Sequence, residues 1–576
     1  MNKLYEIDMK TLQISYGQVN PKYSLLGGRG LIAKRMVDVV DAKCDPLGPD
    51  NHLIITTGLF AGTKMTTSSR VSIGAKSPMT QTIKEANSGG TYAEFLSEHG
   101  IKMIDIKGVS EKLELIYIDE KGQVNFIDAA DYKGLNNYEV CAKLTEYFGQ
   151  DISIMTIGSA GEKAYRSSAI MFSEFGSNEP VRSAARGGLG SVMGSKNIKA
   201  IVLKRAKVKA NTPYVDETLF DSARKELAKI VLSNASAKAR SKFGTLGGLD
   251  TFAAIGSLPV RNFRGESDER TALVNGPSLY ENLMKHGGKA GLPCQRGCVV
   301  RCSNRYHGSD GAYITSGLQY ETVGLLGPNC DIYDLDAIAK ISRVCDDIGV
   351  DTIEIGCGLG VLMEAGIVPW GDIDITMSLM EEMKEGINTG RILGDGADAV
   401  GKHFKVSRVP VARGQAFPAY DPRATKGTGV SYATSAMGAD HTAGITLGLP
   451  GDSPIEQSIN SQISLAFVDN TFCLFTAGAF LSHPEGPGHL ANLFKGRYGL
   501  DLDFNGMMGI GLATLYYENE FTRNTGYDDT SDSLPQFLYD EISPVSKEKF
   551  DVDQGLFKHV HAAIKKANEN NPLAKL

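Results

Sequence analysis

The N-terminal part of the chain alternates between short apolar runs and glycine-containing turns. The segments YEIDM, HLIITTG, MIDIKGV and LELIYID are typical, with apolar or β-branched residues bounded by glycine or charged residues. Strands of a sheet have this appearance, because their side chains point to opposite faces in turn and the strands are short. We therefore predict a β-rich domain over residues 1–208.

Beyond this region the apolar positions take the spacing of helices. In residues 217–233 they recur three and four positions apart, which places them on one face of a helix. A second helix is predicted over residues 334–348. Asp334 would accept hydrogen bonds at its N-terminus, and Gly349 would end its last turn.

Three regions can thus be distinguished. Residues 209–410 are expected to form a mainly helical domain, and residues 411–576 a second domain of mixed, largely helical character. A chain of 576 residues exceeds the roughly 250–300 residues at which a single core stops growing, so several domains are expected. No internal repeat or low-complexity segment is evident. The predicted fold class is α+β.

Charge and hydropathy narrow the range of partners. The formal net charge is −7, and the lysines and arginines are scattered along the chain. Nucleic acids and anionic membranes are recognised by basic patches, so no nucleic-acid partner is expected. The least polar stretch, residues 352–370, is interrupted by Glu354 and Glu364 and is too short to cross a bilayer. Without a signal-peptide pattern, a cytoplasmic protein with no membrane insertion is expected.

Three of the nine cysteines stand at even four-residue intervals in GLPCQRGCVVRC, at Cys294, Cys298 and Cys302. A disulfide framework fits poorly, because such frameworks belong to short secreted chains. A zinc site usually shows paired Cys-x2-4-Cys knuckles, and no second pair follows here. An iron–sulfur cluster takes thiolates from a compact run and one distant cysteine, and the spacing favours this option. Zinc and three unrelated thiols remain the alternatives.

Two stretches of the predicted β domain have the composition of anion-binding turns. Residues 66–90 and 181–200 combine arginine with serine, asparagine and paired glycines. Glycine lets the backbone approach an anion closely, and a guanidinium neutralises the charge. A tight turn explains either stretch alone, whereas the two together indicate a polyphosphate or a cofactor with two phosphates. GGRG at 27–30 could present N–H groups to a phosphate or form a plain turn, and GCGLG at 356–360 is expected to serve helix packing.

Several longer strings together resemble the tungsten-containing aldehyde:ferredoxin oxidoreductase family. They follow the family's order and span nearly the whole chain: SSRV at 68–71, ANSGG at 86–90, ARGGLGSVMGSKNIKAI at 185–201, the cysteine run at 294–302, DDIGVD at 346–351, YDPRATKGTGVSYATSAMGADH at 420–441 and Cys473. The resemblance implies an N-terminal domain of two sheets that seats a bis-pyranopterin tungsten cofactor, followed by two mainly α-helical domains. Molybdenum is the alternative metal, since both metals use the same pterin sulfurs.

The matching motifs imply which residues bind that cofactor. A magnesium ion would bridge the two pterin phosphates at Asn87 and at the backbone of Ala184. The other residues expected at the phosphates and pterins are Arg70, Ser88, Gly89, Gly90, Arg182, Ser183, Arg186, Gly187, Asp346, Gly349, Asp351 and Asp469. The first pterin element, Asp-x-x-Gly-x-Asp, is intact at 346–351. The second is one residue shorter than in the family and lacks its glycine, which weakens Asp469 as a ligand.

The same resemblance implies a [4Fe–4S] cluster. Cys294, Cys298 and Cys302 would hold it together with Cys473 as the distant fourth ligand. The family's usual spacing is Cys-x2-Cys-x3-Cys, whereas the first interval here is one residue longer. We therefore expect a slightly altered loop around the first two cysteines.

Aldehyde oxidation needs a proton acceptor and a group that polarises the carbonyl. Glu321 in QYETVG and His441 in GADH match the family's active-site residues. Glu321 is therefore expected to act as the general base, and His441 as the donor to the carbonyl oxygen. A surface glutamate and a structural histidine are the alternatives. Tyr432 and Asp440 are weaker candidates for the wall of the pocket.

The function implied is oxidation of aldehydes to carboxylic acids, with electrons passing through the cluster to ferredoxin or to a ferredoxin-like subunit. An oligomer is expected. Two other functions stay open: the tungsten-bearing subunit of an aromatic acyl-CoA reductase of the benzoyl-CoA type, and an iron–sulfur electron-transfer subunit without the pterin cofactor. The intact strings ANSGG, ARGGLG and DDIGVD argue against the electron-transfer subunit.

Overall fold

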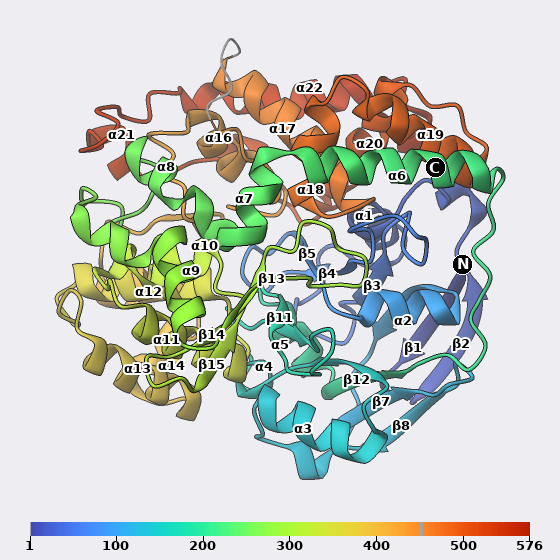
Figure 1. The fold of residues 1–576 in the computed structure, drawn as a ribbon, viewed down its shortest axis with the longest axis horizontal. Helices are drawn as coiled ribbons and strands as arrows, with labels where there is room; N and C mark the ends of the chain where they lie inside the picture. Colours follow the sequence, from blue (N-terminus) through green and yellow to red (C-terminus); the bar gives the residue numbers. More distant parts are fainter. Residues whose placement is uncertain (1, 448–452) are drawn as a thin grey trace.

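The computed structural model describes residues 2–447 and 453–576, and its N-terminal part is built on two six-stranded sheets (Figure 1). The first, ordered β2-β1-β6-β3-β4-β5, comprises β1 (Lys3–Asp8), β2 (Gln13–Gln18), β3 (Leu53–Thr57), β4 (Val71–Lys76), β5 (Ile83–Ser88) and β6 (Ile101–Lys107). The second, ordered β11-β10-β9-β12-β7-β8, comprises β7 (Glu114–Ile118), β8 (Val124–Asp128), β9 (Ile152–Thr156), β10 (Ile170–Phe172), β11 (Arg182–Ala184) and β12 (Ile198–Lys204). The expected two-sheet domain is confirmed.

The two sheets share one topology, which is a repeat of structure that the sequence does not reveal. In each sheet an antiparallel hairpin pairs in parallel with the last strand, β1 with β6 and β7 with β12. Three antiparallel pairings follow in both sheets and end at the edge strands β5 and β11. These two edges lie against each other. The two predicted anion-binding stretches, which contain β5 and β11, therefore meet.

Short helices fill the space between the sheets and cover their outer faces. They are α1 (Gly28–Val39), α2 (Tyr92–His99), α3 (Asn137–Phe148), α4 (Ser159–Glu162) and α5 (Leu189–Ser195). Both α2 and α5 contact both sheets. Their buried residues, among them Tyr92, Leu96 and Val192, share one apolar core with strand residues such as Ile104 and Ile201. Burial of this core holds the two sheets at a fixed relative position.

The middle of the chain is mainly helical. Its helices are α6 (Glu217–Ser233), α7 (Ala235–Phe243), α8 (Leu249–Ala254), α9 (Gly276–Lys285), α10 (Tyr320–Leu326), α11 (Leu335–Ile348), α12 (Thr352–Glu364), α13 (Ile373–Glu385), α14 (Asn388–Leu393) and α15 (Ala397–Phe404). A three-stranded sheet of β13 (Lys289–Leu292), β14 (Ser303–His307) and β15 (Tyr313–Ser316) lies among them. Both predicted helices are confirmed. Asp334 accepts a hydrogen bond from Ala337 N, and Gly349 ends α11 in the left-handed conformation.

The glycines of α12 serve packing, as the sequence predicted. A Cβ at Gly356 would lie 2.7 Å from the Leu325 backbone, and one at Gly358 would lie 2.6 Å from the Leu393 side chain. Both distances are shorter than van der Waals contact, so a larger residue would push α12 away from α10 and α14.

The described residues of the C-terminal region add a short hairpin and seven α-helices: β16 (Val411–Ala412), β17 (Gln415–Ala416), α16 (Lys426–Thr434), α17 (Pro454–Asp469), α18 (Leu474–Ser482), α19 (Gly486–Tyr498), α20 (Phe504–Asn524), α21 (Phe537–Asp540) and α22 (Lys558–Asn568). The long helix α20 packs on both α17 and α1, which joins this region to the β domain. In the described part of the chain no single helix passes the length and hydropathy test for a membrane span; α17 and α18 pass it only as a pair bent by 115°.

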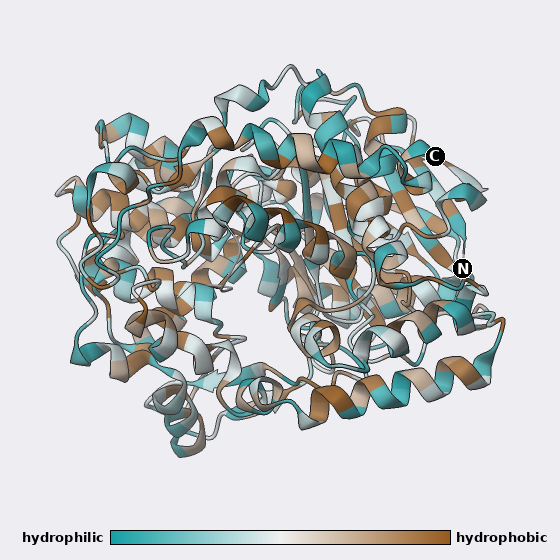
Figure 2. Ribbon diagram, turned by 90° about the horizontal axis from the view of Figure 1, so that it is seen from above, coloured by the Kyte–Doolittle hydropathy of each residue, from teal (hydrophilic) through white to brown (hydrophobic). Residues whose placement is uncertain are grey.

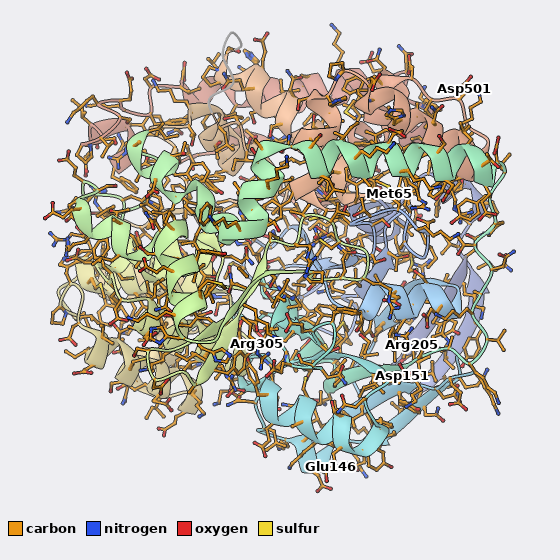
Figure 3. All side chains as sticks on the ribbon, in the orientation of Figure 1. Met65, Glu146, Asp151, Arg205, Arg305 and Asp501 are labelled. Atoms are coloured by element: carbon orange, nitrogen blue, oxygen red, sulfur yellow. The ribbon has the colours of Figure 1, made fainter. Side chains whose placement is uncertain are left out.

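Apolar and polar residues alternate along many of the helices (Figure 2). In α6, for example, Phe220, Leu227 and Val231 are buried, as the helical spacing predicted. Charged side chains also join the regions, as at Arg305, which is labelled in Figure 3. Arg305 on β14 donates to Glu179 of the β domain at 2.6 Å.

Candidate active site

One cavity collects most of the residues that the sequence singled out. It has a volume of about 810 Å³ and lies where the two sheet edges meet α7, α8, α10 and α18. Its lining includes these predicted residues: Arg70, Asn87, Ser88, Gly89, Arg182, Ser183, Cys294, Cys302, Glu321, Asp346, His441, Asp469 and Cys473. Residues far apart in the sequence thus converge on one space, as a binding site requires.

Arg70 and Asn87 are hydrogen-bonded to each other where the neighbouring strands β4 and β5 meet the cavity. Asn87 on β5 pairs in register with Ser72 on β4, and Arg70 directly precedes β4. Arg70 Nε donates to Asn87 Oδ1 at 2.5 Å, and Arg70 Nη2 donates to the Asn87 carbonyl oxygen at 3.3 Å. The Asn87 amide donates to Asp469 Oδ1 at 3.3 Å. A guanidinium is thereby fixed at the end of β5, where it can neutralise an anion.

Strand β11 supplies a second guanidinium. Arg182 forms an ion pair with Glu174 and donates to Ser303 Oγ at 2.6 Å. Its Nε and the Oγ of Ser88 are both buried without a hydrogen-bond partner among the described residues. Buried polar atoms are rarely left unpaired, so these two atoms indicate a polar group that belongs in the cavity. A cofactor that carries phosphates fits this requirement.

Glycine is required where the edge strands approach the cysteine run. Gly90 and Gly187, which follow β5 and β11, have φ angles of +94° and +82°. A Cβ at Gly89 would lie 3.1 Å from Cys294 Sγ, and a Cβ at Gly90 would lie 2.8 Å from the Ser173 carbonyl oxygen. A larger residue at Gly89 would therefore push this edge away from Cys294, and one at Gly90 would push it away from Ser173.

Asp346 and Asp351 lie on either side of the turn that Gly349 makes between α11 and α12. Asp346 lines the cavity, and burial raises its pKa to about 7. Asp351 begins α12 by accepting a hydrogen bond from Ile353 N at 3.0 Å. Its other oxygen lies 3.2 Å from Arg186 Nε. The intact Asp-x-x-Gly-x-Asp element thus brings one carboxyl group into the cavity and one to a guanidinium behind it.

Several predicted residues lie behind the cavity wall. Arg186 donates to the carbonyl oxygens of Ala416 and Ala439 at 2.6 and 2.7 Å, so its guanidinium is used within the protein. The residues outside the described lining are Gly90, Ala184, Arg186, Gly187, Cys298, Gly349 and Asp351. Of these, Gly90, Gly187 and Gly349 have positive φ angles and form turns close in sequence to lining residues.

Asp469 is tied to Arg29, which the sequence analysis did not single out. Arg29 Nη1 lies 3.2 Å from Asp469 Oδ2, and Arg29 Nε donates to Glu518 at 2.7 Å. Burial raises the pKa of Asp469 to about 6, although Arg29 and Arg70 act in the opposite direction. The one sequence feature that could have identified Arg29 is the GGRG string. Gly28 in this string has a φ of +41° and lies against the Asp469 carbonyl group, which places Arg29 in the first turn of α1.

The four predicted cysteine ligands lie close together. All are free thiols; Cys298, Cys302 and Cys473 are buried, and Cys294 is half-buried. Burial raises the pKa of Cys302 to about 12, and the neighbouring Cys294 and Cys473 contribute to the shift. Arg70 Nη1 lies 3.9 Å from Cys473 Sγ, so one guanidinium contacts both the thiol cluster and Asn87.

The longer first cysteine interval is accommodated by a turn. Gly297, directly before Cys298, has a φ of +74°, and a Cβ there would meet nothing within 4 Å. The extra residue is thus taken up where the chain has free space. Cys298 N also donates to the carbonyl oxygen of Gln295 at 3.3 Å, which closes this turn.

Glu321 and His441 face each other inside the cavity. Glu321 Oε2 accepts a hydrogen bond from Ala419 N at 2.7 Å, whereas Oε1 is buried without a hydrogen-bond partner among the described residues. His441 Nε2 lies 3.6 Å from this oxygen, which is too long for a direct hydrogen bond. Burial raises the pKa of Glu321, and His441 opposes the shift. The pair therefore holds one fixed and one open carboxyl oxygen next to an imidazole.

Asp440 and Tyr432 take different positions beside this pair. Asp440 forms a buried ion pair with Lys84, and its Oδ1 lies 3.9 Å from His441 Nδ1. Burial alone would raise the pKa of Asp440, but Lys84 and Arg186 hold it well below its usual range. Tyr432 is fully buried, and its hydroxyl has no hydrogen-bond partner among the described residues. Neither residue is part of the described cavity lining.

An aromatic wall of Phe252, Tyr320 and Tyr420 was not predicted. The Phe252 ring lies 4.7 Å from Tyr320 and 5.2 Å from Tyr420, measured between ring centroids. The Tyr420 ring is 5.9 Å from that of His441. All three aromatic residues line the cavity. They come from separate segments, and single aromatic residues in a sequence usually indicate core positions, so no pattern identified them.

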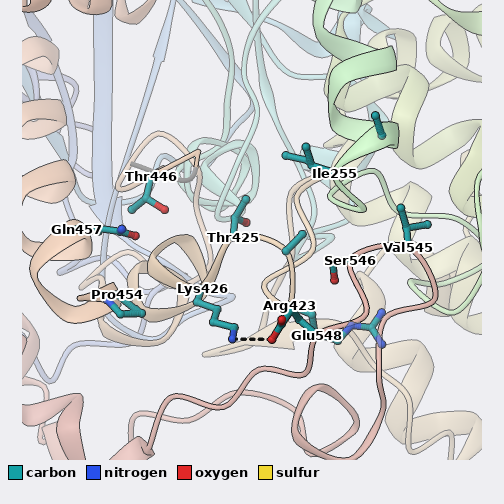
Figure 4. Close-up of a pocket in the computed structure, with 12 residues that line it drawn as sticks. Ile255, Arg423, Thr425, Lys426, Thr446, Pro454, Gln457, Val545, Ser546 and Glu548 are labelled. Carbon is teal, nitrogen blue, oxygen red and sulfur yellow. Dashed lines mark hydrogen bonds and ion pairs between the residues drawn. The ribbon is translucent and has the colours of Figure 1, made fainter. Parts of the chain in front are cut away.

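A second cavity, of about 570 Å³, is shown in Figure 4. It is lined by Arg423, Lys426, Glu548 and others, and Lys426 Nζ lies 3.1 Å from Glu548 Oε2. Its described lining includes none of the predicted site residues. The first cavity is therefore the candidate active site.

Comparison with protein families gives matches over most of the chain. Residues 4–205 match the model of the aldehyde ferredoxin oxidoreductase N-terminal domain, and residues 222–565 match that of domains 2 and 3 of the same enzyme. The tungsten-containing aldehyde ferredoxin oxidoreductase of Pyrococcus furiosus is 29% identical over 556 residues, which cover 91% of this chain and 88% of the relative.

Two other similar proteins have names that describe different activities. The aliphatic sulfonate oxidoreductase, WOR-like subunit, of Pyrococcus furiosus is 27% identical over 81% of this chain and 78% of its own. Among solved structures, the active site complex BamBC of benzoyl coenzyme A reductase, bound to 1,5 dienoyl-CoA, superposes with a TM-score of 0.80. It covers 99% of this chain and 94% of that one at 17% identity, so it shows a common fold.

Proposed function

Because the chain belongs to the aldehyde ferredoxin oxidoreductase family, an oxidoreductase family, we propose that it oxidises aldehydes to carboxylic acids in the cavity that Glu321 and His441 share. The single observation that carries this proposal is the open Glu321 Oε1, which faces His441 Nε2 at 3.6 Å inside the cavity that holds the predicted cofactor residues. The reaction consumes one water and releases two protons and two electrons for each aldehyde.

The residues around the cavity fit a bis-pyranopterin cofactor. Arg70, Asn87, Arg182 and Ser88 would bind its phosphates, and two of them offer buried atoms that have no partner among the described residues. Asp346 and Asp469 would face the pterins. Magnesium would bind near Asn87 and Ala184. When bound, the tungsten cofactor would accept the electron pair, and a [4Fe–4S] cluster would pass electrons on singly.

The four thiols fit a cluster better than a single ion. Among the described residues, no three or more histidine, cysteine, aspartate or glutamate side chains converge as the ligands of one metal ion do. A cluster of four irons is wider than an ion, so its ligands need not meet at one point. Cys294, Cys302 and Cys473 line the cavity, and Cys298 lies next to them, which supports electron transfer from this site to ferredoxin or a ferredoxin-like subunit.

The two catalytic residues divide the proton chemistry. Glu321 is held in place through Oε2, so the open Oε1 can accept a proton from water or from substrate. His441 lines the same cavity with Nε2 toward Glu321, where an Nε2–H group would donate to a substrate carbonyl oxygen. Asp440, held ionised by Lys84, has its Oδ1 3.9 Å from the other ring nitrogen.

The test is anaerobic purification with elemental analysis, followed by a panel of aldehydes with a viologen dye as electron acceptor. We expect tungsten or molybdenum, about four irons per chain, and dye reduction that depends on aldehyde. Iron alone, without tungsten or molybdenum and without aldehyde turnover, would instead identify an electron-transfer subunit. Dye-linked turnover with an aromatic acyl-CoA or its cyclic dienoyl-CoA, and none with any aldehyde, would support a ring reductase.

A further inference from the structure

Arg240 on α7 brings a guanidinium to the mouth of the cavity. Ser236 and Ala239 on the same helix line the cavity and are exposed, as is Gly478 on α18. The cavity therefore opens to solvent between these two helices. They lie close together (Figure 1): Cζ of Arg240 on α7 is 5.2 Å from the ring centroid of Phe475 on α18. A substrate that enters here passes the Arg240 side chain.

This guanidinium differs from the other two in the cavity lining. Arg70 is held by Asn87, and Arg182 is paired with Glu174, in the part of the site assigned to the cofactor. Arg240 forms no ion pair with any carboxylate in the part of the chain that the structure describes; its guanidinium lies over the Phe475 ring. A half-buried cation without a carboxylate partner attracts anions from solvent.

The position of Arg240 relates it to the catalytic pair. Arg240, Tyr420 and Glu321 all line the cavity. Burial and Glu321 raise the pKa of Tyr420 well above its usual value, and Arg240 opposes this shift, so the guanidinium and the general base both lie near Tyr420. The aromatic wall of Phe252, Tyr320 and Tyr420 continues from there to His441. A small molecule that lies along this wall would have one end at Arg240 and the other at His441.

We propose that Arg240 binds an anionic group on the substrate, so that this chain prefers aldehydes that carry a carboxylate, sulfonate or phosphate at the end opposite the formyl group. The inference rests on the proposed aldehyde oxidation and adds the substrate class. A guanidinium binds such groups through paired, charge-assisted hydrogen bonds. The aromatic wall would contact the apolar middle of the molecule, and Glu321 and His441 would act on the formyl group.

The test compares two pairs of aldehydes on the metal-loaded enzyme: 4-carboxybenzaldehyde with 4-methylbenzaldehyde, and succinic semialdehyde with butanal. We expect the anionic member of at least one pair to have the higher kcat/KM. Replacing Arg240→Gln should lower kcat/KM for the anionic member by about tenfold, mainly through KM, because the contact is formed in the ground state as well as in the transition state. The neutral member should change less than about twofold.

A matched control also removes one positive charge from α7, but at a residue outside the cavity. Lys238 lies exposed on α7 and does not line the cavity, so Lys238→Gln should leave both kcat/KM values unchanged. If Arg240→Gln lowered kcat/KM equally for neutral and anionic aldehydes, the inference would be overturned. Arg240 would then act through the nearby Cys473 rather than through the substrate. Wild-type turnover with no preference for the anionic members would also overturn it. Absence of turnover on every aldehyde would overturn the proposed function itself.

Discussion

His441 Nε2 lies 3.6 Å from Glu321 Oε1, and this distance leaves both atoms available to a third group. The other oxygen of Glu321 is fixed by Ala419 N, and the other nitrogen of His441 faces Asp440. Glu321 is thus oriented by a backbone N–H group, and the two side chains are not hydrogen-bonded to each other. Such preorganisation lets a general base and a hydrogen-bond donor act on one substrate without rearranging.

The ionisation of Glu321 predicts that activity falls on the acidic side of the pH–rate profile. A general base must be deprotonated, so activity falls as the pH drops through its pKa. Burial raises the pKa of Glu321, which moves this fall in activity above the pH range of an ordinary glutamate. We expect kcat/KM for a neutral aldehyde to decrease on acidification while metal content and fold stay constant. A profile that is flat down to the usual range of glutamate would contradict the assignment.

His441→Asn tests the carbonyl donor. Asparagine retains an N–H group but places it differently, so stabilisation of charge on the carbonyl oxygen should weaken mainly in the transition state. We expect kcat to fall by at least about tenfold and more than KM rises. Steady-state kinetics on one neutral aldehyde gives both values. A rise in KM with kcat unchanged would show that His441 only binds the substrate.

Cys473→Ala tests the fourth cluster ligand. Removal of one thiolate should lose the cluster or convert it to a form with fewer irons. Iron analysis and EPR spectroscopy of the reduced protein measure this directly. The control is Cys330→Ala, because Cys330 is also a buried thiol, donates to backbone carbonyls, and packs in a different core cluster from Cys298 and Cys302. Identical iron content and spectra in the two variants would remove Cys473 from the cluster.

Arg70→Ala and Asn87→Ala test the phosphate-binding edge of the site. Both residues sit at the end of β5 and bond to each other, so either change removes an anion-binding group. We expect tungsten or molybdenum and pterin to decrease together. Arg70 also contacts Cys473, so Asn87→Ala should affect iron less than Arg70→Ala does. Full pterin content in both variants would show that the phosphates bind elsewhere.

The sequence predicted the regular parts of this fold well. Helix α11 begins after Asp334 and ends at Gly349 as expected, because capping chemistry is local and therefore visible in a few residues. The shared topology of the two sheets was not visible, since strand pairing between distant segments depends on apolar alternation that many sequences satisfy. The family resemblance, not periodicity, supplied the expectation of two sheets.

The candidate site was predicted unevenly for similar reasons. Residues in ordered strings, such as Asn87 and Glu321, were found because their neighbours identify the family, and the structure brings them to one cavity. Arg29 and Arg240 were missed because their surroundings come from distant parts of the chain. Arg29 pairs with Asp469, and Arg240 lines the same cavity as the aromatic wall. No local pattern marks a guanidinium whose neighbours are set by tertiary structure.

The most direct test of the account is aldehyde turnover by Glu321→Gln enzyme with full cofactor and cluster. Glutamine keeps the shape of the side chain and its hydrogen bond from Ala419 but cannot accept the proton. We predict a loss of about 10²–10⁴ in kcat with tungsten, pterin and iron at wild-type levels. Glu381→Gln, an exposed change on α13, serves as the control. Wild-type turnover by the fully loaded Glu321→Gln enzyme would contradict the account.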